Sequence, residues 1–96
     1  MEQLKEKIED SVTDDSYYNV IMFNDDVTPF EYVIMVLNRI FGYQPDEGLG
    51  IAMHIHMNGK AIVASTSMEE AYKKMEEVDQ MNERFGYLLQ TNVEKA

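Results

Sequence analysis

The order of local structure signals along the chain constrains the fold more than any single residue does. Three short segments rich in aromatic and β-branched residues alternate with helical patterns inside only 96 residues. A chain of this length can build one hydrophobic core and one domain. The predicted order is strand 17–23, helix 29–41, helix 45–58, strand 60–66, helix 68–84 and strand 87–93. This β-α-α-β-α-β order predicts a single small α+β domain, with helices packed on one face of a three-stranded sheet.

Helix starts are the sharpest of these signals. Thr28 precedes Pro29, and Glu31 follows three residues after Thr28, which is the pattern of a capping box with proline in the first turn. Ser67 and Glu70 repeat the capping pattern ahead of the third helix. We therefore expect Thr28 and Ser67 to be N-caps.

Apolar spacing predicts which faces are buried. The first helix is expected to bury Val33, Val36, Leu37, Ile40 and Phe41. The third helix is expected to bury Met68, Ala71, Tyr72, Met75 and Val78. In the strand 60–66, simple alternation would put Ala61 and Val63 on one face, opposite Ile62 and Ala64.

Charge and residue content exclude several classes of function. Eighteen acidic residues against eight basic ones give a net charge of −10, so nucleic acid and anionic membrane surfaces would repel the chain. Cysteine is absent, which excludes disulfides, zinc thiolates and thiol nucleophiles. No apolar run approaches the ~20 residues that cross a bilayer, and the charged first residues lack a signal core. We expect a cytoplasmic protein whose partners are cationic, apolar or both.

The first residues differ from the rest in composition. Residues 1–15 carry six acids and two lysines, with Leu4, Ile8 and Val12 at helical spacing. That apolar stripe is thin, and the polar residues after it weaken a helix. We expect residues 1–16 to form a mobile acidic arm and residues 17–96 to form the folded core.

Asn24-Asp25-Asp26, directly after the first strand, is a candidate site. Asn and Asp commonly form a turn here, because they bond their own backbone and tolerate left-handed conformations. Two neighbouring carboxylates also repel each other unless a cation or a donor is near. A carboxylate at this loop end suits an ammonium group, with the Asn24 amide adding a donor and an acceptor. From the residues alone, the turn and the ammonium site both stay open.

His54 and His56 are the only histidines. Two residues apart on a helix, they point in different directions and cannot chelate one metal together. His56 lies near the helix C-terminus, where a half-buried histidine stabilised by the helix dipole is the simpler interpretation. His54 is expected on the surface. The N-D-D-V-T run lacks the alternating ligands and the glycine of a calcium loop, so neither a metal nor a cofactor is expected.

Support for enzyme chemistry is weak. No nucleophile stands beside a base, and no glycine-rich loop could hold a phosphate. A carboxylate and an imidazole could act as acid and base, but that pairing is too common to indicate catalysis. A small metal-dependent hydrolase using Asp25, Asp26 and His56 remains as a minor alternative.

Three runs of residues together resemble one family. The run VIMFNDDVTPFEYV at 20–33 closely resembles the N-D-D-x-T-P pattern of ClpS, the adaptor of the bacterial Clp protease. The run HMNGKA at 56–61 matches the family's H-x-x-G-x-A, and YLL at 87–89 matches its final strand. The resemblance extends from about residue 18 to residue 93.

The resemblance implies a non-enzymatic, monomeric adaptor for N-degrons, which are proteins that begin with Leu, Phe, Tyr or Trp. It would hand them to the N-terminal domain of the ATP-dependent unfoldase ClpA, and so to the peptidase ClpP. By resemblance, the free α-ammonium is held by Asn24, Asp26 and His56. The side chain of the first residue enters an apolar pocket whose matching positions are Thr28, Phe30, Val33, Ala52, Ile55 and Leu88.

Two pocket positions depart from the family. Phe30 and Ala52 stand where the family usually has Met, so Ala52 enlarges one wall while Phe30 adds bulk at the gate. Glu69 and Lys74 match positions through which the family contacts the unfoldase, although solvated helix charges are the simpler interpretation. The leading alternative is a protein-surface interaction module of the same fold without N-terminal residue recognition.

Overall fold

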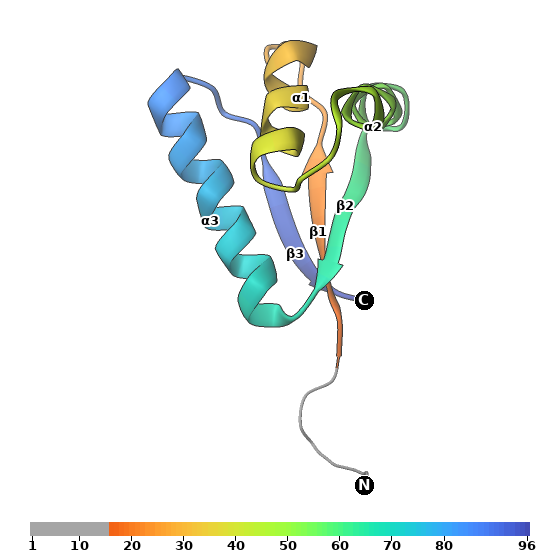
Figure 1. The fold of residues 1–96 in the computed structure, drawn as a ribbon, viewed down its shortest axis with the longest axis vertical. Coiled ribbons are helices and arrows are strands. Elements are labelled where there is room, and N and C mark those ends of the chain that lie inside the picture. The colour runs from red at the N-terminus through yellow and green to blue at the C-terminus, as the bar shows by residue number, and fades with distance from the viewer. Residues whose placement is uncertain (1–15) are drawn as a thin grey trace, which may run out of the picture.

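The computed structural model describes residues 16–96, which form three strands and three helices. In chain order these are β1 (Tyr18–Phe23), α1 (Phe30–Arg39), α2 (Pro45–Asn58), β2 (Lys60–Thr66), α3 (Met68–Phe85) and β3 (Thr91–Lys95) (Figure 1). The predicted α+β class and the β-α-α-β-α-β order are confirmed. The predicted acidic arm, apart from Ser16, lies outside the described residues.

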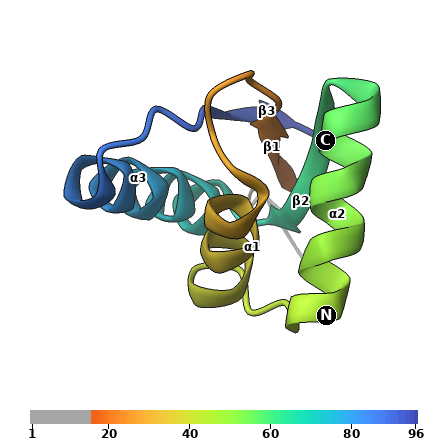
Figure 2. The same cartoon turned by 90° about the horizontal axis from the view of Figure 1, so that it is seen from above.

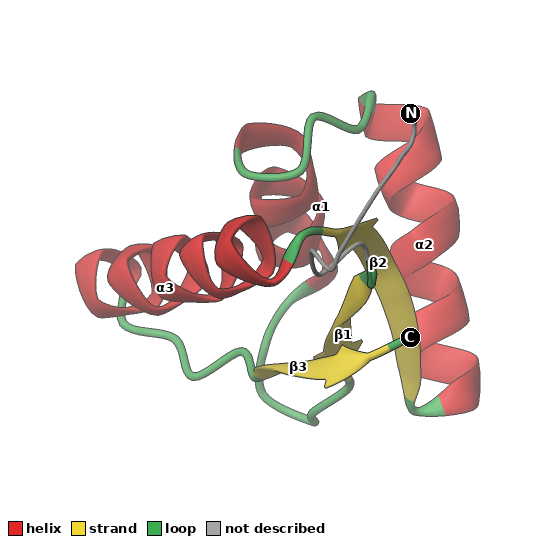
Figure 3. Ribbon diagram, turned by 90° about the horizontal axis from the view of Figure 1, so that it is seen from below, coloured by secondary structure: helices red, strands yellow, loops and turns green. Residues whose placement is uncertain are grey.

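The sheet places β1 in the centre. The strand order is β2-β1-β3, and β1 runs antiparallel to both neighbours (Figure 3). At the end of β1, the Phe23 N–H donates to the Gln90 carbonyl at 3.0 Å and the Asn24 N–H donates to the Gly59 carbonyl at 2.9 Å. The end of β1 is therefore hydrogen-bonded on one side to the residue before β2 and on the other side to the residue before β3, and the loop starts between them.

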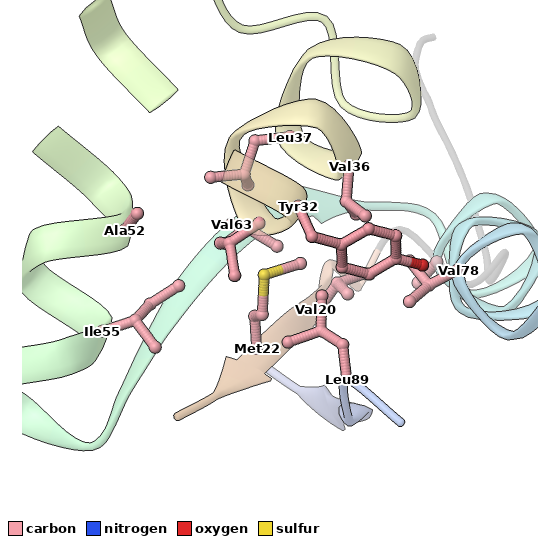
Figure 4. Packing of buried hydrophobic residues seen from close by; sticks show 12 residues of the cluster. Val20, Met22, Tyr32, Val36, Leu37, Ala52, Ile55, Val63, Val78 and Leu89 are labelled. Carbon is pink, nitrogen blue, oxygen red and sulfur yellow. The ribbon is translucent and has the colours of Figure 1, made fainter. Parts of the chain in front are cut away.

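The core lies between the sheet and the helices. α1 stands between α3 and α2, and α2 runs beside β2 (Figures 1 and 2). Val20 and Met22 of β1 are fully buried, since they point at this layer. Figure 4 shows converging side chains from β1, β2, the three helices and the connection before β3: Val20, Met22, Tyr32, Val36, Leu37, Ala52, Ile55, Val63, Val78 and Leu89.

Gly48 lies where α1 and α2 pack against each other. Gly48 is buried in the first turn of α2, and a Cβ placed on it would lie 3.4 Å from Ile34 Cγ2 of α1. Glycine normally weakens a helix by about 1 kcal/mol relative to alanine. At position 48 the backbone of α2 packs against Ile34, and this contact, together with buried Ala52 and Ile55, holds α2 in place.

The start of α1 differs from the prediction. Ser67 is the N-cap of α3, as expected, and its hydroxyl accepts from the Glu70 N–H at 3.1 Å. Thr28, however, does not cap α1, whose N-cap is Pro29 with no side-chain hydrogen bond. The Thr28 hydroxyl instead donates to the carboxylate of Asp25, which is a stronger acceptor than a neutral oxygen.

Two burial predictions also fail. Met68 and Tyr72 of α3 are each 49% exposed, because they lie on the side of the helix next to the buried stripe formed by Ala71 and Val78, and not on the stripe itself. In β2, pairing with β1 shifts by one residue between Ala64 and Ile62. This bulge breaks the predicted alternation, so Val63 and Ala64 both pack against the core.

The last strand begins later than predicted. β3 covers Thr91–Lys95, whereas residues 87–90 form a connection from α3 to the sheet. The side chains in this connection are nevertheless held. The Tyr87 ring packs 4.3 Å from the Tyr32 ring, centroid to centroid, and Leu89 is buried in the core. An apolar run here reflects anchoring of a loop rather than strand pairing.

Candidate functional site

A cavity of about 250 Å³ opens where the loop after β1 meets α1 and the C-terminal half of α2. Its lining is polar at the loop and apolar along the helices. The lining residues are Phe23, Asn24, Asp25, Asp26, Thr28, Pro29, Phe30, Val33, Ala52, Ile55, His56 and Leu89. The structure thus brings together all the predicted site residues from the first strand loop and the first two helices.

Asp25 holds the loop in shape. Its Oδ1 accepts from the N–H groups of Val27 at 2.8 Å and Thr28 at 2.6 Å, and its Oδ2 accepts from the Thr28 hydroxyl at 2.7 Å. Partial burial acts to raise the pKa of Asp25, but these hydrogen bonds outweigh burial and leave its pKa below the ordinary value. For Asp25, the turn interpretation is therefore correct.

Asn24 and Asp26 keep their side chains available. Both are exposed, and neither side chain has a hydrogen bond or an ion pair within residues 16–96. The Asn24 backbone is fixed by its bond to Gly59. An amide oxygen and a carboxylate therefore stand at the cavity mouth without partners among residues 16–96, on a loop that Asp25 orders.

His56 approaches the same mouth from the other side. It lies in the last turn of α2, and its ring makes an edge-to-face contact with Phe30 at 5.4 Å between centroids. The imidazole is exposed rather than half-buried. Neutral histidine offers one nitrogen as an acceptor. Asn24, Asp26 and His56 together supply acceptors suited to a group that carries several N–H donors and a positive charge.

The inner part of the cavity is apolar. Val33 of α1 and Ala52 and Ile55 of α2 line it and are almost completely buried. Figure 4 shows Ala52 and Ile55 projecting from α2 toward the core layer. An apolar group that enters here leaves water, at a gain of about 25 cal/mol per Å² of surface buried.

One predicted pocket residue is wrong. Leu88 is 86% exposed and lies outside the cavity, whereas its neighbour Leu89 is 2% exposed and lines it. The reason is a hydrogen-bonded chain: the Tyr32 hydroxyl donates to Asn82 Oδ1 at 2.8 Å, and Asn82 Nδ2 donates to the Leu89 carbonyl at 2.7 Å. This chain turns Leu89 inward and Leu88 outward.

Sequence reasoning also missed Phe23 and Pro29 as lining residues. Both flank the N-D-D-x-T motif directly, so proximity to the motif was the available signal. For Leu89, no signal in the two adjacent leucines distinguishes inward from outward, because the segment is not a strand with fixed alternation.

Glu69 and Lys74 lie away from the cavity, on α3. Glu69 is exposed. Lys74 Nζ donates to the Ile40 carbonyl at 2.8 Å and lies 3.8 Å from carboxylates of Glu70 and Glu77. Lys74 therefore links α3 to the end of α1, a structural contact that sequence reasoning did not anticipate.

Within residues 16–96, no three His, Cys, Asp or Glu side chains converge in a way that could hold a metal ion. In the same range, no helix is long and apolar enough to span a bilayer. The site is an open recess with an apolar interior and hydrogen-bond acceptors at its mouth.

Comparisons with known proteins give one consistent family. Residues 13–92 match the family model "ATP-dependent Clp protease adaptor protein ClpS". Among curated relatives, the ClpS adapter of Maricaulis maris is 38% identical over 80 residues, covering 83% of this chain and 73% of the relative. The ClpS adapter of Escherichia coli O127:H6 is 36% identical over 96 residues, covering 99% of this chain and 91% of the relative.

A solved structure agrees in fold. Agrobacterium tumefaciens ClpS2, bound to L-phenylalaninamide, superposes with a TM-score of 0.80 at 31% identity, covering 84% of this chain and 98% of that one. The family model covers most of the chain, and the relatives match over most of their own length. The chain therefore belongs to the ClpS family of ATP-dependent Clp protease adaptors.

Proposed function

We propose that this ClpS-family chain is a non-enzymatic adaptor that binds N-degron substrates beginning with Leu, Phe, Tyr or Trp. It recognises the free α-amine together with the first side chain. The observation that carries the proposal is the adjacency, in one cavity, of acceptors that have no partner in the described part of the chain and an apolar interior. The solved relative bound to L-phenylalaninamide supports it, because that compound has both a free amine and an aromatic side chain.

The α-ammonium of the substrate donates to Asn24, Asp26 and His56. Its three N–H groups match three acceptors that approach from the loop and from the end of α2. Hydrogen bonds to a charged group contribute about 1.5–3 kcal/mol each. The net charge of −10 adds a long-range attraction for a positively charged chain terminus.

The first side chain occupies the apolar interior, against Phe30, Val33, Ala52 and Ile55, with Leu89 in place of the predicted Leu88. Thr28 lines the same space, and its hydroxyl is engaged by Asp25. An acetylated or otherwise blocked chain start would lose its charge and two of its donors at the mouth, while its side chain would be unaffected.

Delivery completes the proposed role. The adaptor acts as a monomer in the cytoplasm and presents its cargo to the N-terminal domain of a ClpA-type unfoldase, for degradation by the associated ClpP peptidase. Exposed Glu69 and partly buried Lys74 on α3 contribute to that contact. Residues 1–16 serve the hand-over, and residues 17–96 serve recognition.

Calorimetric titration of the full chain with Phe-led and Leu-led peptides, with and without N-acetylation, tests the proposal. The free-amine peptides are expected to bind saturably, and acetylation is expected to remove binding. Equal binding of free and acetylated peptides would instead favour a surface interaction module. Absence of binding by every free-amine peptide would refute the recognition role.

A further inference from the structure

At one position, the wall of the cavity interior carries only a small side chain. Ala52 lines it and is 2% exposed, so a single methyl group is all that this turn of α2 contributes to the wall. The residues around it are larger and are themselves fixed in the core, since Val33, Ile55 and Leu89 are each at least nine-tenths buried. Because these side chains are held by packing in the core, we do not expect them to move into the space beside the Ala52 methyl group.

The cavity volume fits a ring. At about 250 Å³ for the whole recess, polar mouth included, the space exceeds that of an engineered apolar cavity of about 150 Å³ that takes up benzene. This volume is large enough for a benzyl group, and also for a phenol or an indole. An isobutyl group leaves part of the space empty, and unfilled apolar space weakens binding because its lining loses contacts.

Aromatic residues border the entrance. Phe23 and Phe30 both line the cavity, and Phe30 is held in orientation by its edge-to-face contact with His56. An aromatic pair in an offset or edge-to-face arrangement improves binding by about two- to tenfold beyond the area it buries. An aliphatic group gains the area alone.

We propose that Ala52 and Phe30 make this recess selective for aromatic N-terminal residues, Phe, Tyr and Trp, over leucine. The inference rests on the proposed function and narrows its substrate class. Ala52 provides the depth that a ring needs, and Phe30 provides a ring face or edge next to the acceptors at the mouth. The selectivity resides in the pocket wall and is independent of how tightly the amine is held.

Peptides that differ only in their first residue test this on the full chain. Phe-, Tyr-, Trp- and Leu-led peptides are titrated by calorimetry, and each aromatic peptide is expected to bind at least about fivefold more tightly than the Leu-led one. Ala52→Met should reduce affinity for the Trp- and Tyr-led peptides about tenfold or more, while the Leu-led peptide changes by less than about twofold. Phe30→Leu should weaken the three aromatic peptides by about two- to tenfold and leave the Leu-led peptide nearly unchanged.

Controls separate selectivity from folding. Met53→Ala changes a half-exposed residue of α2 that does not line the cavity, and should alter none of the affinities. Ala52→Val is the smaller substitution, to be used if thermal melting shows that Ala52→Met is not folded, and it should have the same direction of effect. Equal affinity for Leu- and Phe-led peptides, with loss of both on acetylation, would overturn this inference and leave the proposed function standing. A folded Ala52 variant that weakens all four peptides equally would also overturn it, whereas no binding by any free-amine peptide would overturn the proposed function itself.

Discussion

The Thr28 hydroxyl donates to Asp25 Oδ2 at 2.7 Å, and the Thr28 N–H donates to Asp25 Oδ1 at 2.6 Å. This pair of contacts closes the loop between β1 and α1 with one carboxylate. The next carboxylate along the chain, Asp26, takes no part in the loop and remains exposed at the cavity mouth. Of these two adjacent acids, Asp25 therefore holds the loop, whereas Asp26 is free of that role and is the one that we propose binds the substrate amine.

Asp26→Ala should abolish measurable binding of a free-amine peptide with little change in stability. Loss of one charge-assisted hydrogen bond, about 1.5–3 kcal/mol, corresponds to tenfold or more in Kd. Calorimetric titration and a thermal melt measure the two effects. Asp79→Ala, which removes the same charge from an exposed position of α3, is the matched control and should bind normally. A large drop in the melting temperature of Asp26→Ala would show that this residue is structural.

Asp25→Ala should have the opposite profile, with a clear loss of stability. We expect a cost of about 1–2 kcal/mol, since three hydrogen bonds of the loop lose their acceptor. The pKa of Asp25 is lowered in the folded protein from 3.8, so the ionised carboxylate stabilises the fold above that pH. The contribution should shrink as the pH falls through the folded-state pKa. Urea denaturation across an acid pH series checks this: the difference in unfolding free energy between the wild type and Asp25→Ala should narrow as the pH falls, and a constant difference would contradict the argument.

Gly50→Ala should stabilise the protein by about 0.5–1 kcal/mol. Gly50 lies inside α2, and a Cβ there has nothing within 4 Å, so alanine gains helix propensity without a clash. For a domain of this size, the melting temperature should rise by about 4–8 °C per kcal/mol. Gly59→Ala is the contrast, because Gly59 has a φ of +89° that alanine adopts only with strain. Equal effects of the two substitutions would refute the assignment of Gly50 as an ordinary helical position.

Tyr32→Phe should destabilise the protein by about 1–3 kcal/mol, because the buried Asn82 Oδ1 loses its only donor in the described residues. The denaturation midpoint in urea should fall while the m-value stays the same. Since Asn82 also holds the Leu89 carbonyl, affinity for a Phe-led peptide should fall modestly as well. Tyr72→Phe, at an exposed tyrosine of α3, is the control and should change neither quantity. Unchanged stability of Tyr32→Phe would show that the hydroxyl is not needed to hold this chain of contacts.

Deletion of residues 1–15 should leave peptide affinity unchanged and reduce delivery to the protease. Among residues 16–96, those that line the cavity lie between 23 and 89, and we expect the deleted segment to add nothing to recognition. Titration with a Phe-led peptide measures the first quantity, and degradation of a Phe-led reporter by the unfoldase and peptidase measures the second. Full-rate degradation by the shortened chain would remove the hand-over role from residues 1–16.

Much of the fold follows from local signals that agree with one another. The limits of α2 and β2 match the prediction because Pro45 opens the helix, Gly59 ends it, and the strand has no competing helical pattern. The first helix was misplaced at its start because Thr28 has two possible roles. A capping rule cannot decide between them, since the choice depends on Asp25 three residues earlier reaching the same hydroxyl.

The site was largely predictable where residues belong to regular elements, and less so elsewhere. Ala52, Ile55 and His56 share α2, so their spacing places them together. The choice between Leu88 and Leu89 was wrong because residues 87–90 have no periodicity. Their orientation is set by Asn82, a buried polar residue on α3 whose partners lie on other elements.

The hydrogen bond between the Asn24 N–H and the Gly59 carbonyl affects the entropy cost of binding a substrate in the proposed site. It joins the loop after β1 to Gly59, the C-cap residue of α2. The loop side and the α2 side of the recess are therefore linked in the folded protein without a bound substrate. This contact reduces the ordering that the protein must undergo on binding, so that more of the entropy cost falls on the substrate. Substrates with a rigid, extended N-terminal segment should therefore bind more tightly than substrates that have the same first residue and a flexible N-terminal segment.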